Sequence, residues 1–161
     1  MKPILYAEDD ENDVFLMQRV YGKLQIPNPL RVVEDGKMAI AYLAGNPPYE
    51  TRTENPLPCV LIMDLSMPGK HGLEVLKWIK NQPTLMELPV VILTSSNQES
   101  DIERAYETGA SGYFVKPGDP GVLQGILKSI QDYWLTQSRP SVEFQEFAPG
   151  VVRRPPQAVR A

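Results

Sequence analysis

The stretch VLIMDLSMPGKHG, residues 60–72, places an acidic residue directly after an apolar run. Together with Cys59, the four apolar residues 60–63 predict a buried strand over 59–63. Asp64 follows this strand at once, and Pro68-Gly69 is typical of a turn. A carboxylate at the end of a buried strand is costly unless it has a partner or a function. The stretch therefore raises the question of what surrounds Asp64.

Other apolar runs of strand length occur on both sides of this stretch, at 4–7, 30–33, 90–93 and 112–115. The segments between and after them have the apolar spacing of helices, at 14–24, 37–44, 73–79, 102–109 and 122–135. Strands that are apolar throughout indicate burial on both faces, and their alternation with helices indicates a parallel sheet. The sequence therefore predicts a doubly wound (βα)5 α/β fold. For its strand order we take the flavodoxin-like 2-1-3-4-5, one of the common orders of this architecture.

The composition is that of an ordinary globular chain with an acidic balance. The chain has 161 residues, a net charge of −4 and a pI near 5.1, so nothing favours a nucleic-acid partner. One cysteine excludes an intramolecular disulfide and a cysteine metal site. The start of the chain becomes acidic too early for a signal peptide, and no apolar run is long enough for a membrane span. We expect a soluble, cytoplasmic protein without a membrane partner.

Residues 136–161 lose the alternation of strands and helices. The Pro- and Arg-rich end of this segment is typical of a flexible tail, whereas Phe144 and Phe147 favour docking onto a partner or a second copy. Both alternatives stay open. We therefore divide the chain into one domain over 1–135 and a tail over 136–161.

Polar side chains follow four of the predicted strands, and parallel strands present their carboxyl ends at one edge of the sheet. They are the acidic run 8–10, Asp64, Thr94 and Lys116. Several carboxylates in one crevice repel one another unless a cation lies between them, and Mg²⁺ prefers such oxygen ligands. A lysine and a hydroxyl opposite them suit phosphoryl chemistry with a carboxylate nucleophile. Capping the first helix is the preferred role for Asp10.

Four pieces of the sequence carry a family resemblance: ILYAEDD (4–10), VLIMDLSMPGKHGLEVL (60–76), PVVILTSS (89–96) and ASGYFVKP (110–117). In this order and at these spacings they resemble the receiver domain of two-component response regulators. The resemblance implies that Asp64 accepts a phosphoryl group from a histidine kinase. It also implies that Asp9 binds Mg²⁺ directly, that Glu8 helps through water, and that the Ser66 carbonyl is a further ligand. Mn²⁺ is expected to substitute for Mg²⁺.

The same resemblance assigns the remaining site residues. Thr94 hydrogen-bonds the phosphoryl group, and Lys116 forms an ion pair with it. A cis peptide bond before Pro117 is expected to direct Lys116 inward, and Tyr113 is the switch residue. The implied protein is a signalling switch rather than an enzyme. It phosphorylates itself from small phosphodonors in the presence of Mg²⁺ and later loses the phosphoryl group by autodephosphorylation. Two residues depart from the family pattern: His71 stands where an acidic residue is usual, and Gly118 where an aromatic residue is usual.

The resemblance narrows to small single-domain regulators that take phosphate from bacterial phytochromes. These regulators tend to form homodimers through the fourth helix, fifth strand and fifth helix, and residues 136–161 are too few for a DNA-binding output domain. An aspartate-nucleophile phosphohydrolase is the alternative, but that class needs a second acid where Ser66 stands. A flavodoxin-like electron carrier would need a phosphate loop in place of EDDEND (8–13). A receiver-like domain that works without phosphate stays open.

Overall fold

The computed structural model describes residues 1–135, 144 and 148–154. Within them, one parallel sheet has the order β2-β1-β3-β4-β5, which confirms the predicted doubly wound fold. The strands are β1 (Ile4–Ala7), β2 (Leu30–Val33), β3 (Val60–Met63), β4 (Val90–Thr94) and β5 (Gly112–Val115). The helices are α1 (Glu11–Leu24), α2 (Gly36–Ala44), α3 (Gly72–Lys80), α4 (Glu99–Thr108), α5 (Pro120–Ile130) and a π-helix, η1 (Gln131–Leu135). None of these described helices is both long and apolar enough to cross a lipid bilayer.

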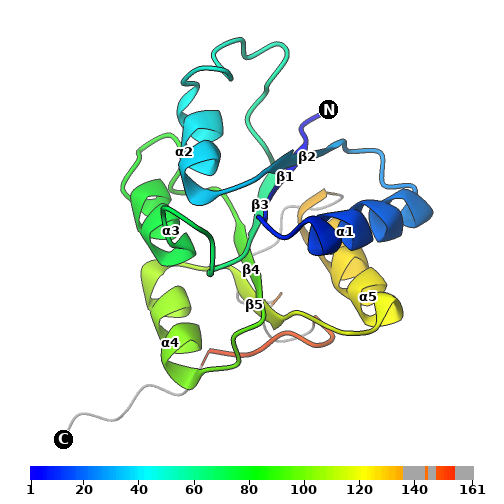
Figure 1. The fold of residues 1–161 in the computed structure, drawn as a ribbon. Helices are drawn as coiled ribbons and strands as arrows, with labels where there is room; N and C mark the ends of the chain where they lie inside the picture. Colours follow the sequence, from blue (N-terminus) through cyan, green and yellow to red (C-terminus); the bar gives the residue numbers. More distant parts are fainter. Residues whose placement is uncertain (136–143, 145–147, 155–161) are drawn as a thin grey trace, which may run out of the picture.

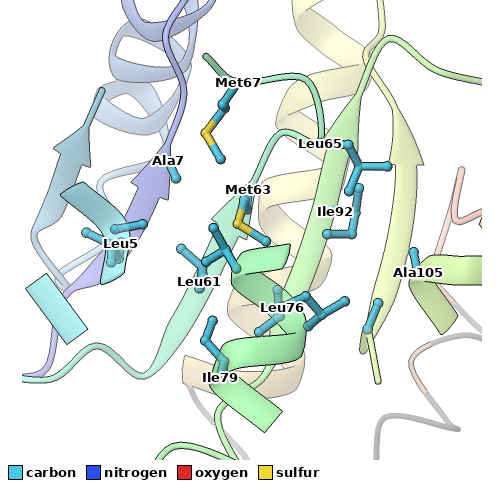
Figure 2. Packing of buried hydrophobic residues seen from close by; sticks show 14 of the residues in the cluster. Leu5, Ala7, Leu61, Met63, Leu65, Met67, Leu76, Ile79, Ile92 and Ala105 are labelled. Atoms are coloured by element: carbon cyan, nitrogen blue, oxygen red, sulfur yellow. The ribbon is translucent and has the colours of Figure 1, made fainter. Parts of the chain in front are cut away.

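Helices cover both faces of the sheet, with α1 and α5 on one side and α2, α3 and α4 on the other (Figure 1). Because successive residues of a strand point to opposite faces, each strand divides its side chains between two apolar clusters. Leu5, Leu61 and Met63 belong to the cluster under α2, α3 and α4, part of which Figure 2 shows. Tyr6 and Ile62 belong to the cluster under α1 and α5. Burial on both faces explains why these strands are apolar throughout.

Helix α1 begins directly after the acidic run that follows β1. Asp10 Oδ1 accepts hydrogen bonds from the backbone N–H groups of Asn12 at 2.8 Å and Asp13 at 3.1 Å. These bonds satisfy two N–H groups that have no partner within the helix. The capping role predicted for Asp10 is therefore confirmed, and it fixes the first turn of α1 next to the end of β1.

Helix α3 begins against the loop that follows β3. The N–H of Gly72 donates to the carbonyl of Leu65 at 2.9 Å, and a Cβ at Gly72 would lie 2.5 Å from the carbonyl oxygen of Asp64. Only glycine permits this approach. His71 is the N-cap of α3, and its Nδ1 accepts the N–H of Leu73 at 3.1 Å. An acidic residue at this position would accept the same bond, which explains the departure at His71.

Part of the C-terminal segment lies along the outer edge of the sheet. Val152 N–H donates to the Tyr113 carbonyl of β5 at 2.7 Å, and the Tyr106 hydroxyl of α4 donates to the Val152 carbonyl. Phe144 is fully buried, and a Cβ at Gly112 would lie 2.6 Å from its ring. Figure 1 shows residues 148–154 passing close to β5 and α4. The rest of the predicted tail, 136–143, 145–147 and 155–161, lies outside the described residues.

Candidate functional site

Three strand ends bring two carboxylates and one lysine together at the carboxyl edge of the sheet. The Nζ of Lys116, after β5, lies 2.6 Å from Oε1 of Glu8, after β1, and 2.8 Å from Oδ2 of Asp64, after β3. The exposed fractions of the three side chains are 16%, 0% and 6% in the same order. The predicted site residues Glu8, Asp64 and Lys116 therefore form one contiguous and largely buried ion cluster.

Asp13 is a fourth member of this cluster, and the sequence reasoning missed it. Its Oδ2 lies 2.6 Å from the Nζ of Lys116, and its side chain is 35% exposed. A signal for it exists in the helical spacing, because Asp13 precedes the fully buried Met17 by one turn of α1. Residues four apart share a helix face, so the acid at position 13 is directed toward the sheet rather than toward solvent.

Burial and the lysine set the protonation of the cluster. Burial raises the pKa of the Glu8 carboxyl to about 7, although Lys116 acts in the opposite direction. For Asp64, burial alone would raise the pKa, but the hydrogen bond and the charge of Lys116 outweigh it and lower the pKa. For Lys116, burial alone would lower the pKa, and the bonds to the three carboxylates raise it. Asp64 is therefore an anion at neutral pH, as a nucleophile must be.

Thr94 ends β4 and is fully buried. Buried side-chain polar atoms in the described part of the chain have hydrogen-bond partners, with the exception of Oγ1 of Thr94. The hydroxyl is close enough to Asp64 to help lower the pKa of that carboxyl, but no well-formed hydrogen bond joins them. A buried hydroxyl without a partner costs free energy. The site is therefore suited to receive a further hydrogen-bond acceptor beside Asp64, which an oxygen of a phosphoryl group would be.

Tyr113 of β5 lies inside the domain. Its side chain is buried, and its hydroxyl donates to the carbonyl of Ser96, in the loop after β4, at 2.8 Å. This buried position is compatible with the switch role that the resemblance implies for Tyr113. The role of Tyr113 as a switch stays a prediction.

A second group of carboxylates overlaps the ion cluster. One oxygen each of Glu8, Asp9 and Asp64 lies within 4.8 Å of the others, and this set of donors fits a hard divalent cation. The two oxygens of Glu8 already contact Lys116 and the N–H groups of Asp9 and Asp10, which favours an indirect role for Glu8. The N–H of Ser66 donates to Oδ1 of Asp64 at 3.1 Å, so the loop holds the carboxylate in place.

The expected cis peptide before Pro117 is wrong. Among the described residues, the cis peptide bond is Pro47-Pro48, in the loop after α2. Lys116 is placed in another way, because its N–H donates to the carbonyl of Thr94 at 2.7 Å and extends the pairing of β4 and β5. The lysine therefore leaves the sheet at the level of Thr94 and points to the carboxylates.

Comparison with known proteins agrees with this arrangement. Residues 4–128 match the family described as the response regulator receiver domain. The response regulator Rcp1 of Synechocystis sp. is 36% identical over 134 residues, which cover 83% of this chain and 89% of Rcp1. The crystal structure of the phosphorylated cyanobacterial phytochrome response regulator RcpA has a TM-score of 0.77 at 34% identity and covers 86% of this chain and 96% of its own. The Mn²⁺-bound form of Rcp1 has a TM-score of 0.76 at 34% identity, with coverages of 87% and 99%. The chain therefore belongs to the response regulator receiver domain family.

Proposed function

We propose that this receiver domain accepts a phosphoryl group on Asp64 from a histidine kinase and signals through protein contacts as a single-domain regulator. One observation supports this function above the others: a buried, ionised Asp64 carboxylate lies beside the ammonium of Lys116 and a Thr94 hydroxyl that has no partner. RcpA is described as a phytochrome response regulator and as phosphorylated. By this likeness, the phosphodonor proposed for the present chain is a bacterial phytochrome.

The proposed transfer is a displacement at phosphorus. One oxygen of Asp64 attacks the phosphoryl group, and the bond from phosphorus to the donor's histidine nitrogen breaks with its electron pair passing to the nitrogen. Lys116 faces the negative charge on the phosphoryl oxygens, and Thr94 donates its free hydroxyl to one of them. Water later hydrolyses the acyl phosphate and restores the carboxylate. The protein is in this proposal a switch rather than an enzyme with a separate substrate.

A divalent cation completes the proposed site. Asp9, Asp64 and the carbonyl of Ser66 would hold Mg²⁺, with Glu8 acting through water, and Mn²⁺ would substitute, as the Mn²⁺-bound Rcp1 structure suggests. When bound, the cation neutralises charge on the oxygens of the transferring group. The grouping of Glu8, Asp9 and Asp64 supports this assignment, because carboxylates this close together repel one another and the single charge of Lys116 does not balance all three.

Metal-dependent phosphorylation tests the proposed function. The wild-type protein incubated with acetyl phosphate and Mg²⁺ should gain the mass of one phosphoryl group, as measured by intact-protein mass spectrometry. Addition of excess EDTA should reduce the labelled fraction at least tenfold, and Mn²⁺ should restore it, because the carboxylates need a cation beside the incoming group. An unlabelled wild-type protein in the presence of Mg²⁺ would exclude the function.

The raised pKa of Glu8 predicts a pH-dependent metal affinity. Its pKa is about 7, so the carboxyl is charged above that pH and neutral below it. A neutral carboxyl attracts a cation less well, so the apparent Kd for Mg²⁺ should rise about tenfold when the pH falls from about 8 to about 6. Isothermal titration at both pH values measures this change. Glu8→Gln is neutral at both, so its profile should be flat, and an equal slope in the variant would contradict the assignment.

The α4-β5-α5 face is the proposed homodimer interface. The described part of the C-terminal segment lies on this face, through Val152 on Tyr113 and Phe144 on Gly112, so a dimer formed there must bury or displace it. We accordingly propose a receiver domain over 1–135 with a docking segment within 136–161. We also propose that the protein acts in the cytoplasm. Sedimentation velocity at micromolar concentration should show a dimer with or without beryllofluoride. A monomer under both conditions would count against this interface.

The phosphohydrolase alternative is less favoured. That class needs an acid two residues after the nucleophile, and this chain has Ser66 at that position. The backbone N–H of Ser66 donates a hydrogen bond to Asp64, and its side chain offers only a hydroxyl. A hydroxyl is a poor general acid or base at neutral pH.

A further inference from the structure

We propose that Asp13 is a positioning residue that anchors Lys116 for phosphoryl transfer to Asp64. This inference rests on the proposed function, since it assigns a role within the same site. Asp13 lies on α1, outside the strand ends that supply the other site residues, and its contact with Lys116 at 2.6 Å is as short as that of Glu8.

The ammonium of Lys116 has three acceptors for its three protons. They are Glu8, Asp13 and Asp64, at 2.6, 2.6 and 2.8 Å. Charge-assisted bonds of this length are strong, and together they fix the position of Nζ. Each loss of an acceptor therefore leaves the lysine with one proton that must find water or another partner.

Only one of the three acceptors stands apart from the candidate cation cluster. Among the described residues, the group that would hold a metal consists of Glu8, Asp9 and Asp64, and Asp13 does not belong to it. A cation between those carboxylates competes with Lys116 for them. The contact between Asp13 and Lys116 then remains as the anchor of the lysine that does not depend on the metal.

The surroundings keep Asp13 in place. The backbone N–H of Asp13 is bonded to the cap residue Asp10, and the residue one turn further along α1, Met17, is fully buried. A small pocket beside the pair, open to solvent on one side, is lined in part by Tyr6, Met17 and Lys116. The Lys116 side chain is only 16% exposed, and its three ion pairs restrict the ammonium group to one position. A fixed ammonium group is worth more in the transition state than a mobile one.

The decisive comparison is between two single-charge changes in the same turn of α1. Asp13→Asn removes the anchor, whereas Glu11→Gln removes a charge from an exposed residue that is not among the three ion-pair partners of Lys116. At saturating Mg²⁺, the rate of phosphorylation by acetyl phosphate should fall roughly tenfold in Asp13→Asn, the size typical of losing a partner that orients a ligand, and less than twofold in Glu11→Gln. Urea unfolding of both variants tests whether they are folded.

Two further readouts separate positioning from a general structural effect. Asp13→Glu keeps the charge and should recover at least half of the lost rate. The ¹⁵Nζ resonance of Lys116 should shift in Asp13→Asn but not in Glu11→Gln. Equal rates in Asp13→Asn and Glu11→Gln, or a faster rate in Asp13→Asn, would overturn the inference. If the wild type were still labelled in that case, the proposed function would stand. An unlabelled wild type would instead overturn the proposed function.

Discussion

Replacing Asp64 with asparagine should abolish phosphorylation by acetyl phosphate. The amide cannot act as the nucleophile that forms an acyl phosphate, so the intact mass of Asp64→Asn should not change under conditions that label the wild type. The substitution is close to isosteric, and the side-chain carbonyl can still accept the N–H of Ser66 that now bonds to Oδ1 at 3.1 Å. Lys116 keeps Glu8 and Asp13 as partners, so the domain should remain folded.

Asp10→Asn is the matched control for this experiment. It makes the same chemical change at an acid close to the site, and asparagine caps a helix about as well as aspartate does. This control should be labelled at nearly the wild-type rate. Equal labelling of Asp64→Asn and wild type would mean that another residue accepts the group, and the assignment of Asp64 would then be wrong.

Replacing Phe144 with alanine should destabilise the domain by about 3–5 kcal/mol, the usual cost of removing a buried aromatic side chain. Phe144 is fully buried, with ring centroids 4.3 Å from Trp134, 5.1 Å from Tyr133 and 5.9 Å from Phe114. Removal of the ring leaves a cavity that is bounded by α5 and η1 on one side and by the sheet on the other. Gly112 has no side chain that could fill this cavity. Urea unfolding followed by circular dichroism measures the change in free energy.

Phe15→Ala supplies the control for Phe144→Ala. The deletion is chemically identical, but Phe15 lies on α1 with 66% of its surface exposed, so its removal should change the free energy of unfolding by less than about 0.5 kcal/mol. Equal effects of the two substitutions would show that Phe144 is not packed against the domain in solution.

Much of the fold follows from the strands themselves. Four of them are buried on both faces or nearly so, and a continuous apolar run such as 60–63 identifies a parallel strand that helices cover on each side. The relative order of the strands is taken from the flavodoxin-like type of doubly wound fold, because apolar runs do not record which strand pairs with which. Chain order and the rule for strand ends then place Glu8, Asp64, Thr94 and Lys116 at one edge.

The contacts of three residues depend on information that the sequence pattern does not carry. Asp13 meets Lys116 across 103 positions, and although its spacing from the buried Met17 places it on the inward face of α1, that spacing does not identify Lys116 as its partner. His71 acts through a local cap that sequence patterns associate with Ser, Thr, Asp and Asn rather than with histidine. Phe144 lies in a segment without periodicity, so its burial depends on the space above Gly112, which only the folded sheet defines.

The C-terminal segment has a consequence for the solubility of the protein. β5 is the outer strand of the sheet, and the bond from Val152 occupies the outward-facing carbonyl of Tyr113. An open outer strand is a template on which other chains can add strands, and this is a common route to aggregation. A protein shortened before residue 144 would leave this carbonyl open and would lose the Phe144 ring that packs on Gly112. The described part of the segment therefore occupies a backbone group of β5 that would otherwise be available to a strand of another chain.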